Sequence, residues 1–164
     1  MLKKTFLKTA NISHSKFLFL LYNYSISNGF SISRKKINYK HHVQWLKDKL
    51  NDGDTKIYIG YIGIKKIGYV RFEKIEKNKY VVSIANHPNF IGKGLGSKLL
   101  KLSINKFSRN KKLISIYALV KKNNLPSKKT FIKNNFKLKK KISKSLIEKP
   151  AKNLICYVFK NKLI

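Results

Sequence analysis

The chain has 164 residues, a net charge of +32 and a single cysteine, Cys156. This length suits one domain with its own hydrophobic core, and one thiol excludes an intramolecular disulfide framework and a cysteine-rich metal site. The longest apolar run, Phe17 to Tyr22, is far too short to cross a membrane. We therefore expect a single domain over residues 1–164 in the reducing cytoplasm, with no bound metal and no membrane partner.

The positive charge comes almost entirely from lysine, because arginine occurs only at Arg34, Arg71 and Arg109. Proteins that recognise base edges or bind phosphates through two hydrogen bonds favour arginine. The lysines are also spread over every segment, and with the abundant Asn and Ile they indicate the codon bias of an AT-rich genome. We expect nucleic acid to bind non-specifically, if at all, whereas anionic cofactors and nucleotide-linked substrates would be attracted.

The N-terminal part predicts a strand followed by two helices. A short strand covers about Lys4 to Thr9, and either Asn11 or Ser13 can cap the helix that follows and ends near Tyr24. A second helix spans about Tyr39 to Leu50. The apolar residues that indicate the first helix recur at helical spacing: Phe17, Leu20, Leu21 and Tyr24.

The middle of the chain changes to strands rich in Ile, Tyr, Val and Phe. They cover Lys56 to Ile62, Ile67 to Ile75 and Tyr80 to Ala85, with turns at Gly63 to Lys66 and at Glu76 to Lys79. Turns this short connect neighbouring antiparallel strands. The sequence therefore predicts an antiparallel meander.

The second half returns to a helical period and then alternates strands with helices. A helix begins near Gly96 with the apolar face Leu99, Leu100, Ile104 and Phe107. The later elements are a strand over Leu113 to Val120, a helix over Pro126 to Asn134, a last strand over Leu154 to Phe159, and an optional strand within Phe136 to Ile142. The order βααβββαβαβ predicts an α/β (layered α+β) domain with a mixed, mostly antiparallel sheet flanked by helices.

Three alternate glycines, Gly92, Gly94 and Gly96, lie between the last strand of the meander and the next helix. Glycine allows positive φ and a close backbone approach, so successive N–H groups can converge on one anion, and the helix start adds its unpaired donors. Lys93 and Ser97 can add a charge and a hydroxyl. A pyrophosphate suits this turn, although an ordinary flexible turn explains the glycines equally well.

Other phosphate loops fit these residues poorly. A Walker loop needs Gly-Lys followed by Ser or Thr, whereas Lys93 is followed by Gly94. A dinucleotide-binding fold places its glycines after the first strand of a parallel βαβ unit, and here they follow an antiparallel meander.

The segment Asn89 to Leu100, with His87-Pro88 before it, resembles motif A of the GNAT superfamily, the fold of N-acetyltransferases that use acetyl-coenzyme A. Ile91 departs from that motif, which usually has Gln or Arg there. A second segment is similar to the family's downstream pattern, with Asn135 in place of a glycine. Its matching residues are Val120, Asn124, Ser127, Phe131, Lys133 and Phe136.

The resemblance implies a GNAT fold and acetyl-coenzyme A as cofactor. The backbone groups of Ile84, Ala85 and Asn86 would bind the pantetheine arm and the thioester carbonyl. A backbone N–H that polarises this carbonyl would give oxyanion-type stabilisation. The pyrophosphate would lie on Gly92, Lys93, Gly94, Leu95, Gly96 and Ser97. Asn124, with Ser127 in the same motif, would contact the cofactor or an ordered water.

Two groups that many relatives use in proton transfer are replaced in this chain. Val81 matches the position of the usual Glu base, and Phe131 matches the position of the usual Tyr acid. An alkylammonium must lose a proton before it attacks, so Glu73 and His87 are the candidate catalytic residues. A surface carboxylate paired with lysine and a turn histidine are the alternative interpretations.

His42-Val43-Gln44-Trp45 resembles the His-x-x-Trp segment of family members that acetylate nucleotide-linked amino sugars in bacterial cell-surface sugar synthesis, such as the pseudaminic and other nonulosonic acid pathways. His42 and Trp45 are thus candidate substrate residues, although Trp45 can equally belong to the core, and Arg34, Lys35 and Lys36 can meet a diphosphate. The expected reaction is transfer of the acetyl group to a primary amine of a small molecule. The alternatives are a ribosomal-protein N-terminal acetyltransferase and a non-catalytic basic protein that binds nucleic acid on the same fold.

Overall fold

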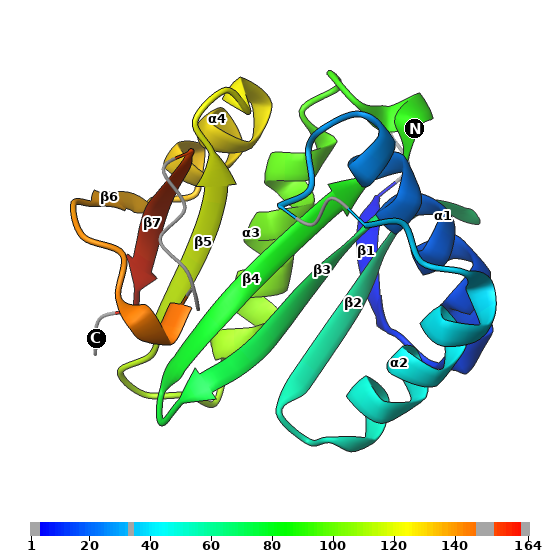
Figure 1. Ribbon diagram of the computed structural model, residues 1–164, viewed down its shortest axis with the longest axis horizontal. Coiled ribbons are helices and arrows are strands. Elements are labelled where there is room, and N and C mark those ends of the chain that lie inside the picture. The colour runs from blue at the N-terminus through cyan, green and yellow to red at the C-terminus, as the bar shows by residue number, and fades with distance from the viewer. Residues whose placement is uncertain (1–3, 33–34, 147–152, 162–164) are drawn as a thin grey trace.

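The computed structural model describes residues 4–32, 35–146 and 153–161, and in this part of the chain seven strands form one sheet in the order β1-β2-β3-β4-β5-β7-β6 (Figure 1). Every neighbouring pair is antiparallel except β4 with β5. The strands are β1 Thr5–Thr9, β2 Thr55–Ile62, β3 Lys65–Glu76, β4 Lys79–Asn86, β5 Ser115–Lys121, β6 Lys137–Lys139 and β7 Leu154–Lys160. The predicted mixed, mostly antiparallel sheet is confirmed.

Helices cover both faces of this sheet (Figure 1). They are α1 Ser15–Ser27, α2 Tyr39–Asn51, α3 Leu95–Ser108 and α4 Leu125–Lys133. Within the described residues, no helix combines the length and apolar character needed to cross a membrane.

Alternation along the strands divides the core between the two faces, because successive side chains of a strand point to opposite sides. On one face Val70, Phe72 and Val82 pack with the apolar stripe of α3. On the other face Ile57, Ile59, Tyr61, Tyr69 and Ala85 pack with Leu18 and Leu21 of α1 and Leu46 of α2. The chain therefore has a three-layer arrangement, with α1 and α2 on the opposite side from α3.

Strands β4 and β5 pair over only a short stretch before they separate. Residues 79–81 of β4 pair with residues 115–117 of β5, and among the described residues the rest of β4 has no strand partner on that side. The two strands diverge toward their C-terminal ends (Figure 1). The far half of β4 thus presents unpaired backbone groups to the opening.

Most element predictions are confirmed, including the optional strand, which is β6. The predicted apolar face of α1 is confirmed at Leu21 and wrong at Leu20, which is 64% exposed, because Leu18 is buried in its place. Asn11 caps a short 3-10 turn that precedes α1 rather than α1 itself. Leu113 has φ +53 and is exposed, so β5 begins two residues later than predicted.

Candidate active site

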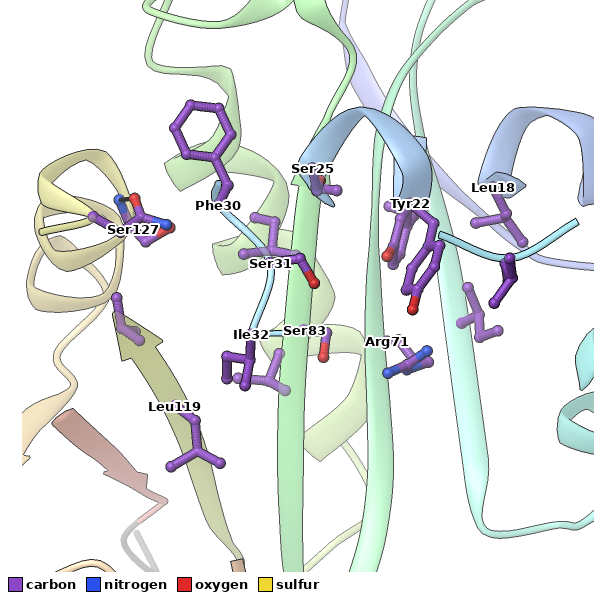
Figure 2. A pocket seen from close by; sticks show the side chains of 18 of the residues that line it. Leu18, Tyr22, Ser25, Phe30, Ser31, Ile32, Arg71, Ser83, Leu119 and Ser127 are labelled. Carbon is purple, nitrogen blue, oxygen red and sulfur yellow. Dashed lines mark hydrogen bonds between the residues drawn. The ribbon is translucent and has the colours of Figure 1, made fainter. Parts of the chain in front are cut away.

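A cavity of about 560 Å³ lies at the opening between β4 and β5, with α1 and α2 on one side and α4 on the other (Figure 2). Its volume is in the range of pockets that hold small molecules. The segment after α1 spans part of the opening, where the amine of Lys121 on β5 donates a hydrogen bond to the Gly29 carbonyl at 2.9 Å. Its polar lining comprises Tyr22, Ser25, Ser31, His41, His42, Trp45, Tyr69, Arg71, Ser83, Asn124 and Ser127.

The glycine turn between β4 and α3 has the geometry of an anion site. Gly94 precedes α3 with φ +69, and no side chain caps this helix start. The first turn of α3 contains no acidic residue, so its free N–H groups and the positive end of the helix dipole are not neutralised. Gly92, Lys93 and Gly94 are exposed and Leu95 is half-buried, so an anion can approach the backbone.

Gly96 serves packing rather than backbone conformation. A Cβ atom at this position would lie within van der Waals contact of the Asn86 side-chain amide, too close for both to fit. Asn86 thereby fills the space between α3 and the end of β4, and its Oδ1 is buried without a hydrogen-bond partner among the described residues. The predicted cofactor residues Asn86 and Gly96 are thus in direct contact.

Ser97 is fixed by a residue that the sequence analysis did not single out. Asn134, buried at the C-terminal end of α4, donates from Nδ2 to the Ser97 hydroxyl at 3.0 Å and to the Ser97 carbonyl at 3.2 Å. The next residue, Asn135, which stands in place of the family's glycine, has φ +63, a left-handed conformation that Asn tolerates at a helix end. Since Asn134 occupies an acceptor site of the hydroxyl, the hydroxyl proton can point toward the glycine turn.

Asn124 and Ser127 both line the cavity at the start of α4. The Asn124 side chain accepts a hydrogen bond from the Ser127 backbone N–H at 3.1 Å, so it caps the helix. Ile84 and Ala85 line the same cavity from the unpaired part of β4. Phe131 also lines it, and this side chain has no hydroxyl to act as an acid.

His42 and Trp45 lie in the wall of the cavity, on α2. His42 is only 2% exposed and packs against the rings of Phe19 and Trp45, with centroids 5.5 and 5.6 Å away. Burial lowers the pKa of His42 below its ordinary value, opposed by a hydrogen bond to the Ser15 backbone. His42 is therefore a neutral wall residue near neutral pH. Lys35 and Lys36, expected beside it, do not line the cavity, and Arg34 lies outside the described residues.

Arg71 brings a positive charge to this cavity, and sequence reasoning missed it. It lies on β3 opposite Ser83 of β4, and its guanidinium stacks over Trp45 at 5.0 Å. One face of the Trp45 ring is thus covered by Arg71. The arginine within the mostly apolar run from Ile67 to Phe72 was the available signal, because a charge is buried there only with a partner.

Glu73 does not line the cavity among the described residues. Its two oxygens are held in ion pairs, one with Lys49 of α2 at 2.9 Å and the other with Arg71 at 2.8 Å. This matches the alternative interpretation of a carboxylate paired with lysine. The carboxylate is thus held between Lys49 and Arg71.

His87 faces away from the main cavity. It lines a separate, open hollow with Phe17, Lys66 and Lys93, and its ring stacks on Phe17 with centroids 6.3 Å apart. Its Nδ1 accepts a hydrogen bond from the Asn89 backbone N–H at 3.3 Å, as a turn histidine does. The two predicted catalytic residues, Glu73 and His87, are thus not brought together in the cavity.

Residues 21–136 match the sequence profile of the acetyltransferase (GNAT) family. The chain belongs to this family. It is therefore an N-acetyltransferase that uses acetyl-coenzyme A, as the glycine turn and the diverging strands indicate. No curated protein matches the chain significantly.

Solved structures with the same fold are similar over nearly the whole chain. A putative acetyltransferase, yncA, from Salmonella typhimurium with acetyl-coenzyme A has a TM-score of 0.77 and 16% identity, over 95% of this chain and 93% of that one. Spermidine N-acetyltransferase from Vibrio cholerae with coenzyme A and spermine has a TM-score of 0.82 and 13% identity, over 95% of both chains. Campylobacter jejuni N-acetyltransferase PseH has a TM-score of 0.69 and 19% identity, over 96% of this chain and 99% of that one.

Proposed function

We propose that this acetyltransferase acetylates the primary amine of an amino sugar that is carried on a nucleotide. The observation that carries the proposal is the charge of the cavity. Among the described residues its lining includes Arg71 and no Asp or Glu. The five described carboxylates of the chain all lie elsewhere, and Glu73, which binds Arg71, is already paired with two cations.

This charge favours neutral or anionic acceptors over polyamines. A polyamine carries several positive charges, and a pocket that binds it needs carboxylates to replace the lost hydration. The cavity offers a fixed cation in their place. A sugar with hydroxyl groups instead meets serine and tyrosine hydroxyls, at Ser31, Ser83 and Tyr22. A nucleotide adds phosphates, which the charge of +32 attracts.

The cofactor fits the other half of the cavity. Gly92 to Ser97 would bind the pyrophosphate through backbone N–H groups at the uncapped start of α3. The unpaired edge of β4 at Ile84, Ala85 and Asn86 would bind the pantetheine arm, with Asn124 and Ser127 on the opposite side. Bound acetyl-coenzyme A supplies the acetyl thioester, and N–H donors of β4 would stabilise negative charge on its carbonyl oxygen.

The cavity also favours the reactive form of the acceptor. An amine attacks only when it is neutral, and a nearby positive charge lowers the pKa of an ammonium group. Arg71 on the cavity wall would therefore raise the neutral fraction of a bound amine. The roles proposed from the sequence for Glu73 and His87 as bases gain no support from the geometry, since neither lines the cavity.

The test is an acceptor panel with saturating acetyl-coenzyme A, in which released coenzyme A is measured. The panel contains a uridine diphosphate-linked 4-amino-4,6-dideoxyhexose, spermidine and a peptide with a free N-terminal amine. We expect the highest kcat/KM with the amino-sugar nucleotide. A preference for spermidine or for the peptide would contradict the proposal and leave the acetyltransferase assignment intact.

A further inference from the structure

Arg71 is held as a rigid fork at the wall of the cavity. Its Nη2 is 2.8 Å from Glu73 Oε2, its Cζ lies over the Trp45 ring at 5.0 Å from the centroid, and its side chain is 19% exposed. Among the described residues its Nε is buried without a hydrogen-bond partner. The fold thus leaves one hydrogen-bond donor of the guanidinium unsatisfied, and a buried donor without a partner costs free energy.

Arg71 lies on the same face of the sheet as Ala85 of β4, at which the acetyl group is proposed to bind. It pairs across the sheet with Ser83, and Ala85 lies two residues further along β4 on the same face. Arg71 and Ser83 project into the same space below Tyr22 (Figure 2). The acetyl group is expected at Ile84 and Ala85, so a group bound to Arg71 would lie close to the amine of the acceptor.

Arg71 belongs to a network of ion pairs in which Glu73 contacts Arg71 and Lys49, and Lys49 also contacts Asp52 at 3.5 Å. Of these four charged residues only Arg71 lines the cavity. None of the described carboxylates, Glu73 included, lines it. A planar guanidinium in this state matches the geometry of a carboxylate or a phosphate, to which it can bind through two parallel hydrogen bonds.

We infer that the acceptor carries an anionic oxygen group, a phosphate or a carboxylate, that binds to Arg71, with Glu73 as the residue that positions the guanidinium. This inference rests on the proposed acetyltransferase function, because it assumes that the acceptor occupies this cavity. It adds a specificity determinant on the body of the acceptor, separate from the cofactor site. Amines without an anionic group lack this contact.

The first experiment measures binding to protein whose cofactor site is saturated with coenzyme A. Uridine diphosphate and succinate are titrated calorimetrically, so that the two sources of the anion are distinguished. We expect one of them to bind the wild-type protein, and Arg71→Met to weaken its binding by about 10- to 100-fold. Arg109→Met is the matched control, because it removes the same charge from an exposed position at the end of α3. Equal weakening in both variants, or binding of neither anion, would overturn the inference.

The second experiment needs no variant and compares turnover of paired acceptors. One pair is the nucleotide-linked amino sugar and its methyl glycoside, and the other is 4-aminobutyrate and its methyl ester. The anionic member of at least one pair should have the higher kcat/KM, by about tenfold or more. Equal turnover within both pairs would overturn the inference without affecting cofactor binding. Anion binding that depends on Arg71, without turnover of any acceptor, would support this site and contradict the proposed substrate instead.

Discussion

The proposed cofactor half and the proposed acceptor half of the site are built in different ways. The cofactor half consists of backbone groups in one contiguous stretch, from the edge of β4 through the glycine turn to α3. The acceptor half consists of side chains from α1, α2, β3 and the segment after α1. A site made of backbone groups depends on a few glycines and a helix start, so it tolerates substitutions such as the Ile at position 91. A site made of side chains is altered by each substitution in it.

The largest effect is expected at the glycine turn. Gly94→Glu should abolish the thermal protection that acetyl-coenzyme A gives, because it adds a negative charge at the anion site and an unfavourable left-handed residue. Gly53→Glu is the control, since Gly53 has φ +70 and, like Gly94, open space at its Cβ position. Both variants carry the same backbone strain, so only the loss of protection in Gly94→Glu reports the site. Protection that persists in Gly94→Glu would contradict a cofactor half made of backbone groups.

Glu73→Gln separates a positioning residue from a base. We expect the KM for the acceptor to rise about three- to tenfold, because Arg71 loses one charge-assisted hydrogen bond and its fixed orientation. The kcat and its pH profile should stay close to those of the wild type. A steep fall in kcat with an altered pH profile would restore Glu73 as the base and remove the distinction drawn here between the two halves.

Asn134→Ala tests how α4 supports the glycine turn. The variant loses the hydrogen bonds to Ser97, and we expect acetyl-coenzyme A to bind about two- to fivefold more weakly. Asn28→Ala is matched, because Asn28 also bonds a carbonyl four residues earlier at a helix end, without contacting α3. Titration of acetyl-coenzyme A against both variants measures the difference. Equal affinities would show that Ser97 needs no support.

The smallest effect concerns the pH dependence of folding. Burial lowers the pKa of His42 in the folded state, so the unfolded chain binds a proton first as the pH falls. The free energy of unfolding should therefore decrease from about pH 7.5 to about pH 5.5, and urea unfolding should show a smaller decrease in His42→Gln. His41→Gln is the matched control, because it makes the same substitution at an exposed position of the same helix. His14, whose pKa burial also lowers, contributes alike to both variants.

The backbone half could be proposed from the sequence because its signals are local. The spacing of Gly94 and Gly96 indicated the glycine turn, and Asn135 indicated where α4 ends. For the side-chain half, the sequence indicated which residues take part but not how they are arranged. His42 and Trp45 were found, but their burial and the cover of Trp45 by Arg71 depend on how β3 packs on α2. Glu73 was chosen for its chemistry, and its partners Lys49 and Arg71 could not be known before the register of β3 and α2 was known.

Amide hydrogen exchange with and without acetyl-coenzyme A tests the account most directly, because it reports on the backbone groups that are assigned to the cofactor. We predict that acetyl-coenzyme A slows exchange at residues 92–97 and 84–86, and leaves the turn at Gly53 unchanged. Protection confined to other segments, or no protection at residues 92–97 at saturating acetyl-coenzyme A, would contradict the account.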